Sequence, residues 1–200
     1  MKGFGIAAVV VSALGCCASA GATTVDVGAN GNAFTGGLAF APADITAQVG
    51  DTVRWRNNDV LVPHTVTQVH NLFRLTGDYG QTPLNPPGFG PGDTRERVFE
   101  AGTFHYYCEV HPEQMRAVIA VPPTVESVGH RVRVTWAPSG TTGEVFDVKR
   151  RVHGRYELVR KRTTATGATF RGGGAFKVRA RSASDPNAFS DYSPPGHARE

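Results

Sequence analysis

Apolar and polar residues alternate along several short segments of this 200-residue chain. The alternation is clearest at residues 43–59, 102–108, 130–138 and 174–182. Such alternation turns one face of a strand toward a core and the other toward water. The three- and four-residue apolar spacing of a helix is hard to find. Because 24 glycines and 13 prolines punctuate these runs, the pattern predicts an all-β protein built of short strands.

The first half of the chain predicts a series of strands that form a small antiparallel sandwich or barrel. A stretch rich in turn-forming residues separates His70 from Arg95, and loops of that length often have a function. The strands are expected at residues 24–29, 43–50, 51–59, 64–69, 95–100, 102–108 and 116–121, with a turn at residues 49–51.

Proline and charge mark a boundary between two halves of the chain. Two prolines follow the apolar segment 116–121. Farther along the second half, residues 144–162 predict a hairpin that turns at His153 and Gly154. Residues 21–122 hold ten acidic and six basic side chains, a net charge of −4. Residues 123–200 hold seven acidic and fourteen basic side chains, a net charge of +7. We therefore expect two domains, 21–122 and 123–200.

Residues 1–20 have the order of features found in a secretory signal. Lys2 precedes an apolar run at residues 4–14, and the small residues 18–20 form a cleavage site. The run is too short to span a membrane comfortably, so no transmembrane span is expected. Cleavage after Ala20 would place the mature protein in the periplasm, on the cell surface or outside the cell. Lipid attachment at Cys16 is the alternative.

Removal of the signal leaves one cysteine, Cys108, because Cys16 and Cys17 go with it. A single thiol in an oxidising compartment pairs between chains, reacts, or binds a metal. His111 and Met115 follow Cys108 on the same short loop, and His64 offers a further imidazole from upstream. Two histidines and a cysteine with a weak methionine are the ligand pattern of blue-copper sites.

Other interpretations of this group remain open at the level of residues. Cys108 is also compatible with a buried structural thiol, and zinc binds cysteine and histidine well. A Cys/His nucleophile pair would need a base oriented by a third group, which the motif lacks. The soft thioether of Met115 favours copper. His70 and His105 are expected to be surface or structural residues, and Trp55, which alternates with Val53, to face the core.

The first half resembles the plastocyanin/azurin group of cupredoxins over about residues 25–121. The segments "FAPADITAQVGDTVRWRNND", "PHTV" and "FEAGTFHYYCEVHPEQM" carry the resemblance. It implies a Greek-key β-sandwich with one type 1 copper ion bound by His64, Cys108, His111 and Met115. Gln114 is the alternative axial ligand. Thr65 stands where several relatives carry asparagine.

The resemblance also implies a function, that of a single-electron carrier with a protein redox partner. In this family the partner docks on an apolar patch near the second histidine, and we expect Pro63, Pro112 and Phe89 to form it here. Four protein ligands leave no position for a substrate, so the protein is not expected to be an enzyme. A copper-binding or copper-delivery protein without redox turnover, and a surface adhesion protein, are the alternatives.

Residues 123 to about 195 resemble a fibronectin type III module, which implies an immunoglobulin-like β-sandwich. The strand with Trp136, the segment "VRARS" and the closing "SDYSPP" carry this resemblance, although Phe176 stands where many members have a tyrosine. The basic clusters 149–151 and 160–162 are expected to be a solvated sheet face. The alternative partner is an anionic surface polymer. Nucleic acid is not expected, because aromatic residues do not interleave with the basic ones.

Overall fold

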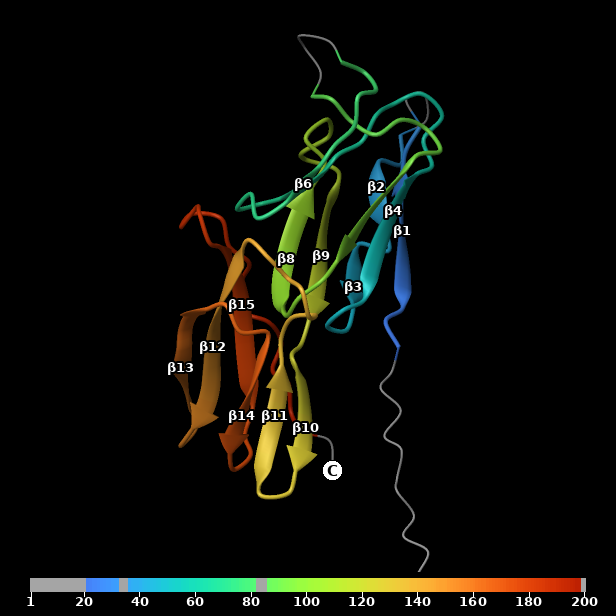
Figure 1. The fold of residues 1–200 in the computed structure, drawn as a ribbon. Coiled ribbons are helices and arrows are strands. Elements are labelled where there is room, and N and C mark those ends of the chain that lie inside the picture. Colours follow the sequence, from blue (N-terminus) through green and yellow to red (C-terminus); the bar gives the residue numbers. More distant parts are fainter. Residues whose placement is uncertain (1–20, 33–35, 82–85, 199–200) are drawn as a thin grey trace, which may run out of the picture.

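The computed structural model describes residues 21–32, 36–81 and 86–198. The predicted secretory signal and Cys16 therefore lie outside the described residues. Within the described residues the chain forms fifteen strands and no helix, which confirms the all-β prediction. The strands form two sandwiches that follow one another along the chain (Figure 1).

The first sandwich consists of a four-stranded and a five-stranded sheet. The four-stranded sheet contains, in spatial order, β2 (Ala39–Ala41), β1 (Thr24–Asn30), β4 (Thr52–Asn57) and β7 (Thr94–Val98). The five-stranded sheet contains β3 (Asp44–Thr46), β9 (Arg116–Val121), β8 (Gly102–Tyr107), β5 (Val66–Gln68) and β6 (Arg74–Leu75).

The two sheets of the first sandwich are mixed rather than purely antiparallel. β1 pairs with β4 in parallel, and β3 pairs with β9 in parallel. The expectation of an antiparallel arrangement is therefore wrong for these two pairs. Parallel neighbours require a crossover, and the chain makes one from β1 to β4 through β2 and β3. The arrangement brings the ends of β4, β8 and β9 toward the same end of the sandwich (Figure 1), and β5 pairs with the end of β8 there.

Aromatic side chains fill the space between these sheets. Trp55, Phe99, Phe104 and Tyr106 are all buried, and the rings of Trp55 and Tyr106 meet edge to face at 5.7 Å between centroids. Trp55 faces the core, as its alternation with Val53 predicts. Each buried aromatic side chain contributes about 2–3 kcal/mol through removal of apolar surface from water. This core is a rigid support for the loops at its end.

The second sandwich consists of two three-stranded sheets. The hairpin between β12 (Glu144–Val152) and β13 (Arg155–Thr163) turns at His153 and Gly154, whose φ angles are +47° and +83°. Two successive residues with positive φ are typical of a tight hairpin turn, which confirms this predicted hairpin. One sheet contains β10 (Thr124–Val128), β11 (Arg131–Thr135) and β14 (Gly167–Arg171), and the other β13 (Arg155–Thr163), β12 (Glu144–Val152) and β15 (Phe176–Ser182).

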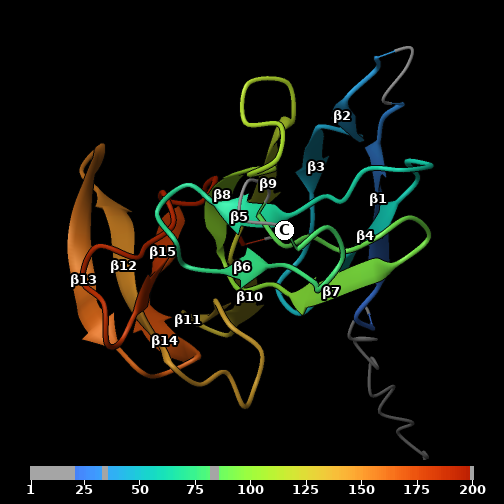
Figure 2. The same ribbon diagram turned by 90° about the horizontal axis from the view of Figure 1, so that it is seen from above.

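The segment after β15 joins the two sandwiches. On one side Ser190 and Ser193 donate their backbone N–H groups to the carbonyls of Ala180 and Val178 in β15. On the other side Asp191 and Thr103 in β8 exchange two backbone hydrogen bonds of 2.9 and 3.1 Å. The segment therefore lies between β15 and β8, which are neighbours in both views (Figures 1 and 2).

Candidate copper site

Three of the four predicted ligands lie on the loop between β8 and β9. Cys108 follows β8 directly, and Met115 precedes β9 directly. The loop closes on itself, because the Cys108 amide donates to the Met115 carbonyl at 3.0 Å and the Met115 amide donates to the His111 carbonyl at 3.0 Å. The β8–β9 pairing therefore sets the positions of Cys108 and Met115, and the loop carries His111 between them.

The fourth predicted ligand, His64, lies just before β5 and is held by the long loop. Its backbone forms an isolated bridge with Phe89, with two hydrogen bonds of 3.2 and 2.9 Å. Gly88 makes this close approach possible, because a Cβ atom there would lie 2.7 Å from the His64 carbonyl oxygen. The glycine-rich loop thus has a structural role in covering His64.

The loops bring one sulfur and two nitrogen atoms together. Cys108 Sγ lies 3.7 Å from His64 Nδ1 and 3.8 Å from His111 Nδ1. One ligand atom from each of the three residues lies within 4.8 Å of the other two. A trigonal ion with metal–sulfur and metal–nitrogen bonds of about 2.3 and 2.1 Å, as zinc has, would separate sulfur from nitrogen by about 3.8 Å. The three side chains therefore have the spacing that one metal ion requires.

Burial separates the two candidates for a weaker fourth ligand. Met115 is completely buried, as are Cys108 and His64, whereas Gln114 is exposed. His111 is partly exposed and is the member of the group that faces the protein surface. Of the two candidates, Met115 is therefore the one that lies in the same buried core as Cys108.

Thr65 ties the His64 segment to Cys108. The Thr65 amide donates to Cys108 Sγ at 3.4 Å, and its hydroxyl accepts from the Glu109 amide at 2.8 Å. The Thr65 hydroxyl therefore links the two segments. A hydrogen bond to the sulfur stabilises the thiolate form that binds a metal.

The electrostatics of the site keep both histidines neutral. Burial, and after it the neighbouring His111, lower the pKa of His64 to about 4, although Asp59 opposes this shift. Burial also lowers the pKa of His111. A neutral imidazole has a free lone pair, so both rings are ready to bind a metal at neutral pH.

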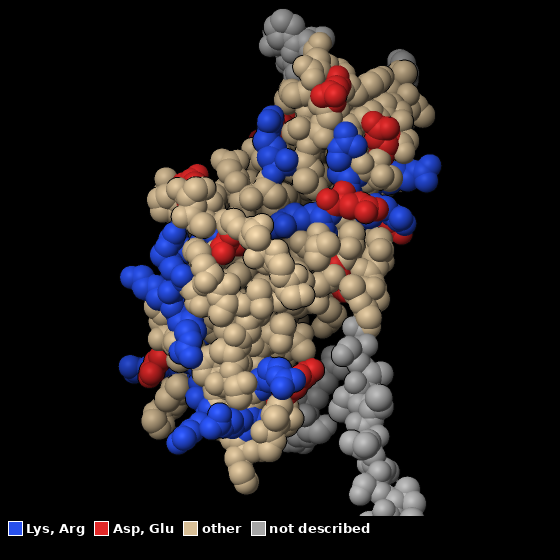
Figure 3. Space-filling view, viewed as in Figure 1, with Lys and Arg blue, Asp and Glu red and all other residues tan. Residues whose placement is uncertain are grey.

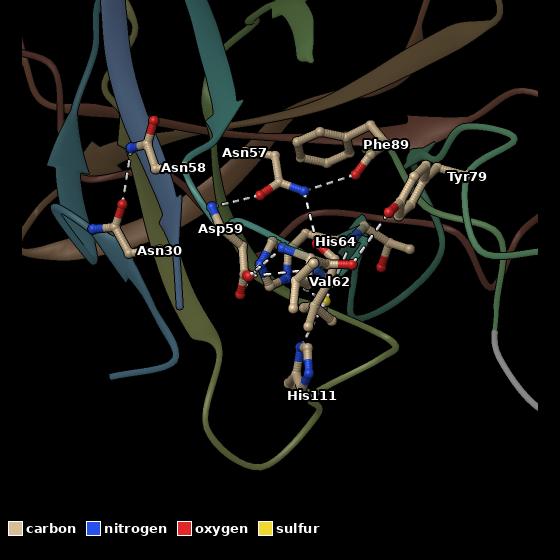
Figure 4. Close-up of polar contacts among 12 residues, drawn as sticks. Asn30, Asn57, Asn58, Asp59, Val62, His64, Tyr79, Phe89 and His111 are labelled. Carbon is tan, nitrogen blue, oxygen red and sulfur yellow. Dashed lines mark hydrogen bonds and ion pairs between the residues drawn. The ribbon is translucent and has the colours of Figure 1, made fainter. Parts of the chain in front are cut away.

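Two residues near His64 were not singled out from the sequence. Asn57 donates from its side chain to the carbonyls of Val62 and Phe89, both at 2.9 Å, and accepts from the Asp59 amide at 2.8 Å (Figure 4). Asp59 is buried and its carboxylate lies 3.6 Å from His64 Nε2. The only sequence signal was "NND" at the end of a strand, five residues before the histidine.

The other two histidines considered lie elsewhere. His70 stacks on Phe189 at 4.3 Å between ring centroids, and His105 is half exposed with its ring 3.5 Å from the Asp191 carboxylate. Both belong to the contact between the two sandwiches. Neither joins the Cys108 group, in agreement with their expected structural or surface role.

The expected apolar patch has a different composition. Phe89 is completely buried and Pro63 is buried, because the long loop folds over the His64 segment, so the expectation that they form a surface patch is wrong. Pro112 is exposed as expected. Among the described residues of these loops, the large exposed apolar side chains are Val60, Leu61 and Tyr79. Tyr79 donates its hydroxyl to the Leu61 carbonyl at 3.4 Å.

A β-sandwich that brings one thiol and two imidazole nitrogens to one buried point defines the class of mononuclear copper proteins. Residues 25–122 match the model of the copper binding proteins of the plastocyanin/azurin family. The chain belongs to this family. Its donor group and its family together indicate one bound copper ion. Residues 123–200 lie outside the match.

Individual relatives are similar over about the same part of the chain. The chloroplastic plastocyanin of Tetradesmus obliquus is 32% identical over 108 residues, which cover 52% of this chain and 70% of that protein. A purple cupredoxin from Nitrosopumilus maritimus is 29% identical and covers 48% of this chain and 97% of its own, with a TM-score of 0.35. A copper-containing nitrite reductase from Thermus scotoductus is 25% identical. The match covers 49% of this chain and 22% of that chain, with a TM-score of 0.35.

Proposed function

We propose that this protein is an exported blue-copper protein that transfers single electrons, with His64, Cys108, His111 and Met115 as the copper ligands. The convergence of Cys108 Sγ with the two Nδ1 atoms, at 3.7 and 3.8 Å, carries this proposal. Two histidines and a thiolate in one plane, with a weak thioether, are the ligand pattern of blue-copper electron-transfer sites. Complete burial of Met115 supports its assignment as the axial ligand over the exposed Gln114.

At these ligands copper supplies a one-electron couple between its two oxidation states. The protein holds the ligands in one arrangement, because Cys108 and Met115 are fixed by the β8–β9 pairing and His64 by its bridge to Phe89. Buried Cys108 and His64 keep water away from the sulfur and from one imidazole. A site with four protein ligands has no position for a substrate, so we assign an electron carrier rather than an enzyme.

A copper-delivery protein is the competing function, and electrochemistry separates the two. An electron carrier should show one reversible one-electron wave per chain and keep its copper through repeated cycles. A delivery protein should release copper to a Cu(I) chelator after reduction. Loss of copper within the first cycles would contradict the proposed function.

We assign the docking surface for the redox partner to the exposed apolar side chains Val60, Leu61 and Tyr79 beside the site. Close approach of two apolar surfaces shortens the distance over which the electron moves. Leu61→Lys should therefore slow electron self-exchange between two copies of the protein, measured by NMR line broadening. Val128→Lys, at a valine of similar exposure in the second sandwich (45% against 51% for Leu61), is the matched control. Equal rates in the two variants would contradict the assignment.

The domain division and the export signal complete the proposal. The two prolines between β9 and β10 separate residues 21–122 from residues 123–200, and the paired three-stranded sheets of the second part support a fibronectin type III-like fold. NMR contacts that place a strand after Val121 within a sheet of the first sandwich would contradict this division. Amino-terminal sequencing of the mature protein should begin at Gly21, and an intact Met1 would contradict cleavage.

The second sandwich has a basic hollow that favours an anionic polymer as a partner. The hollow of about 460 Å³ lies on the sheet of β13, β12 and β15, and basic side chains follow this side of the molecule (Figure 3). Its one carboxylate, Asp147, is already paired with Arg179 and Arg181 at 3.0 and 2.9 Å. The lining residues are Asp147, Lys149, Leu158, Lys161, Arg162, Arg179, Arg181 and Tyr192.

Heparin, a sulfated polymer, is a suitable probe for this hollow. Lys149→Ala combined with Lys161→Ala should lower the salt concentration at which the protein elutes from immobilised heparin. Arg131→Ala combined with Arg133→Ala removes the same charge from β11 in the other sheet and should leave elution unchanged. Equal shifts in both double variants would mean that the overall charge of the protein, and not a defined site, sets its elution from heparin, and would contradict a site in the hollow.

A further inference from the structure

Two buried polar atoms beside the copper site have no hydrogen-bond partner within the described part of the chain, and they face one another. They are His64 Nε2 and Asp59 Oδ2, separated by 3.6 Å. Both side chains are completely buried. An unpaired polar group in the interior is costly, and two such groups at this separation are best explained as one interacting pair.

The chemistry of a metal-bound imidazole explains the pair. A neutral imidazole carries one proton, and a ring that binds a metal through Nδ1 carries it on Nε2. The Nδ1 atom of His64 is the one that faces Cys108 Sγ, which leaves Nε2–H to point away from the metal and toward Asp59. A slight tilt of the ring would bring donor and acceptor to hydrogen-bond distance.

We propose that Asp59 is a positioning residue for the copper site: its Oδ2 accepts the Nε2–H of His64, and this fixes Nδ1 as the ligand atom. This inference rests on the proposed role of His64 as a ligand. Copper itself contacts His64, and Asp59 acts through that ring. A metal-bound histidine whose other nitrogen is held by a carboxylate is better oriented and a stronger donor.

The carboxylate is itself fixed in place by a turn. Asp59 Oδ1 accepts the amides of Leu61 and Val62 at 3.0 and 3.3 Å, and the Asp59 amide donates to Asn57 Oδ1 at 2.8 Å. The amides of Leu61 and Val62 thus occupy Oδ1 of Asp59 and leave its Oδ2 for His64 (Figure 4). The turn after β4 thus connects the rigid sheet to the ligand.

The negative charge of Asp59 has a second consequence, for the redox couple. A buried negative charge next to a ligand stabilises the more positive oxidation state of the metal. Asp59 should therefore lower the reduction potential of the bound copper. A residue that only shaped the turn would leave the potential unchanged.

Asp59→Asn tests the positioning role with little change in shape. The side-chain oxygen at Oδ1 is kept, whereas the group that faces His64 becomes an amide donor. Asp51→Asn is the matched control, because Asp51 is also buried and accepts backbone amides, from Thr23 and Gln48, both at 2.8 Å. Asp51 precedes β4 at the end opposite to Asn57, about 20 Å along the strand from the turn.

Zinc affinity, measured by competition with a chromophoric chelator, is the first readout because it needs no redox chemistry. Asp59→Asn should weaken zinc binding by about tenfold to a hundredfold, and Asp51→Asn by less than about twofold. Asp59→Glu, which restores a carboxylate, should recover part of the affinity. Equal affinities in the two asparagine variants would overturn the inference. Thermal unfolding of each variant confirms that it is folded.

The copper form gives the second readout and keeps the two proposals distinguishable. The reduction potential should rise in Asp59→Asn relative to Asp51→Asn, and a slowly exchanging His64 Nε2–H signal should be present in NMR spectra of the wild-type zinc protein only. If zinc affinity falls in Asp59→Asn but Cu(II) gives no blue colour, Asp59 is a positioning residue and the blue-copper proposal fails. If the blue centre forms and the two variants match, the Asp59 inference fails alone.

Discussion

At the scale of single residues, the adjacent side chains of Gln114 and Met115 differ in burial. Met115 is buried beside Cys108 in the core, whereas its neighbour Gln114 faces solvent. The backbone hydrogen bonds of the β8–β9 loop produce this difference, since they fix Met115 directly before β9. Burial therefore favours Met115 in the proposed axial position, for which the sequence left two candidates.

Substitution of Met115 should change the redox potential without removing the blue centre. Met115→Leu keeps the volume but removes the sulfur donor. Because an axial donor stabilises Cu(II) more than Cu(I), its loss should raise the reduction potential. Gln114→Ala should leave the potential unchanged, because that side chain is exposed. Voltammetry of both variants checks this. A shift in Gln114→Ala with none in Met115→Leu would assign the axial position to glutamine.

At the scale of elements, the long loop before β7 supports the ligand His64. Phe89 in this loop is fully buried and bridges the His64 backbone, and the Asn57 side chain joins both segments. Gly88 allows the contact because a side chain there would meet the backbone of His64 and Pro63 Cβ. The loop is therefore part of the framework of the site.

Gly88→Ala should destabilise the protein and weaken metal binding. A Cβ atom at this position would lie 2.7 Å from the His64 carbonyl oxygen, and backbone atoms cannot move aside as a flexible side chain can. We expect a loss of about 1–3 kcal/mol in the free energy of unfolding. Gly173→Ala is the control, because nothing lies within 4 Å of a Cβ atom there. Equal denaturant midpoints for the two variants would contradict this role of the loop.

The elements that the sequence predicted are those with long alternation. β4, β8, β11 and the β12–β13 hairpin follow directly from their patterns, and so does the inward orientation of Trp55. The short strands β2 and β6 have too few residues to show a period of two. The parallel pairing of β1 with β4 was also missed, because alternation specifies a face but not the direction of a neighbour.

The candidate site was predictable to the extent that its residues are close in sequence or carry a distinctive motif. Cys108, His111 and Met115 share one loop, and His64 was found through its "PHTV" motif. Asp59 and Phe89 act through contacts that depend on how two loops fold over each other. A phenylalanine in a glycine- and proline-rich loop therefore looked like a surface residue, although the structure buries it.

At the scale of the whole molecule, charged residues connect the two sandwiches. Arg97 donates to the side-chain oxygens of Glu100, in the first sandwich, and Glu144, in the second, at 2.9 and 2.8 Å. Burial raises the pKa of Glu100 to about 8, with the Glu144 charge adding to the shift and Arg97 opposing it. The folded protein therefore keeps a proton on Glu100 to a higher pH than the unfolded chain does.

The stability of the protein should depend on this proton. The folded state binds it more tightly than the unfolded chain, whose glutamate has a pKa of 4.5. The contribution of Glu100 is therefore complete below about pH 4.5 and is lost as the pH rises through about 8. Between pH 5 and pH 8 the free energy of unfolding of the wild type should fall by at least about 1 kcal/mol more than that of Glu100→Gln. This difference corresponds to about 2–4 °C in Tm. Parallel pH profiles for the two proteins would contradict this account.

The visible absorption and EPR spectra of the mature chain, titrated with Cu(II), test the central claim most directly. The account predicts an intense blue sulfur-to-copper band and narrow copper hyperfine splitting, both saturating at about one ion per chain and both absent in Cys108→Ser. A colourless protein, or the spectrum of ordinary tetragonal copper, would contradict the assignment of His64, Cys108, His111 and Met115 as a blue-copper site.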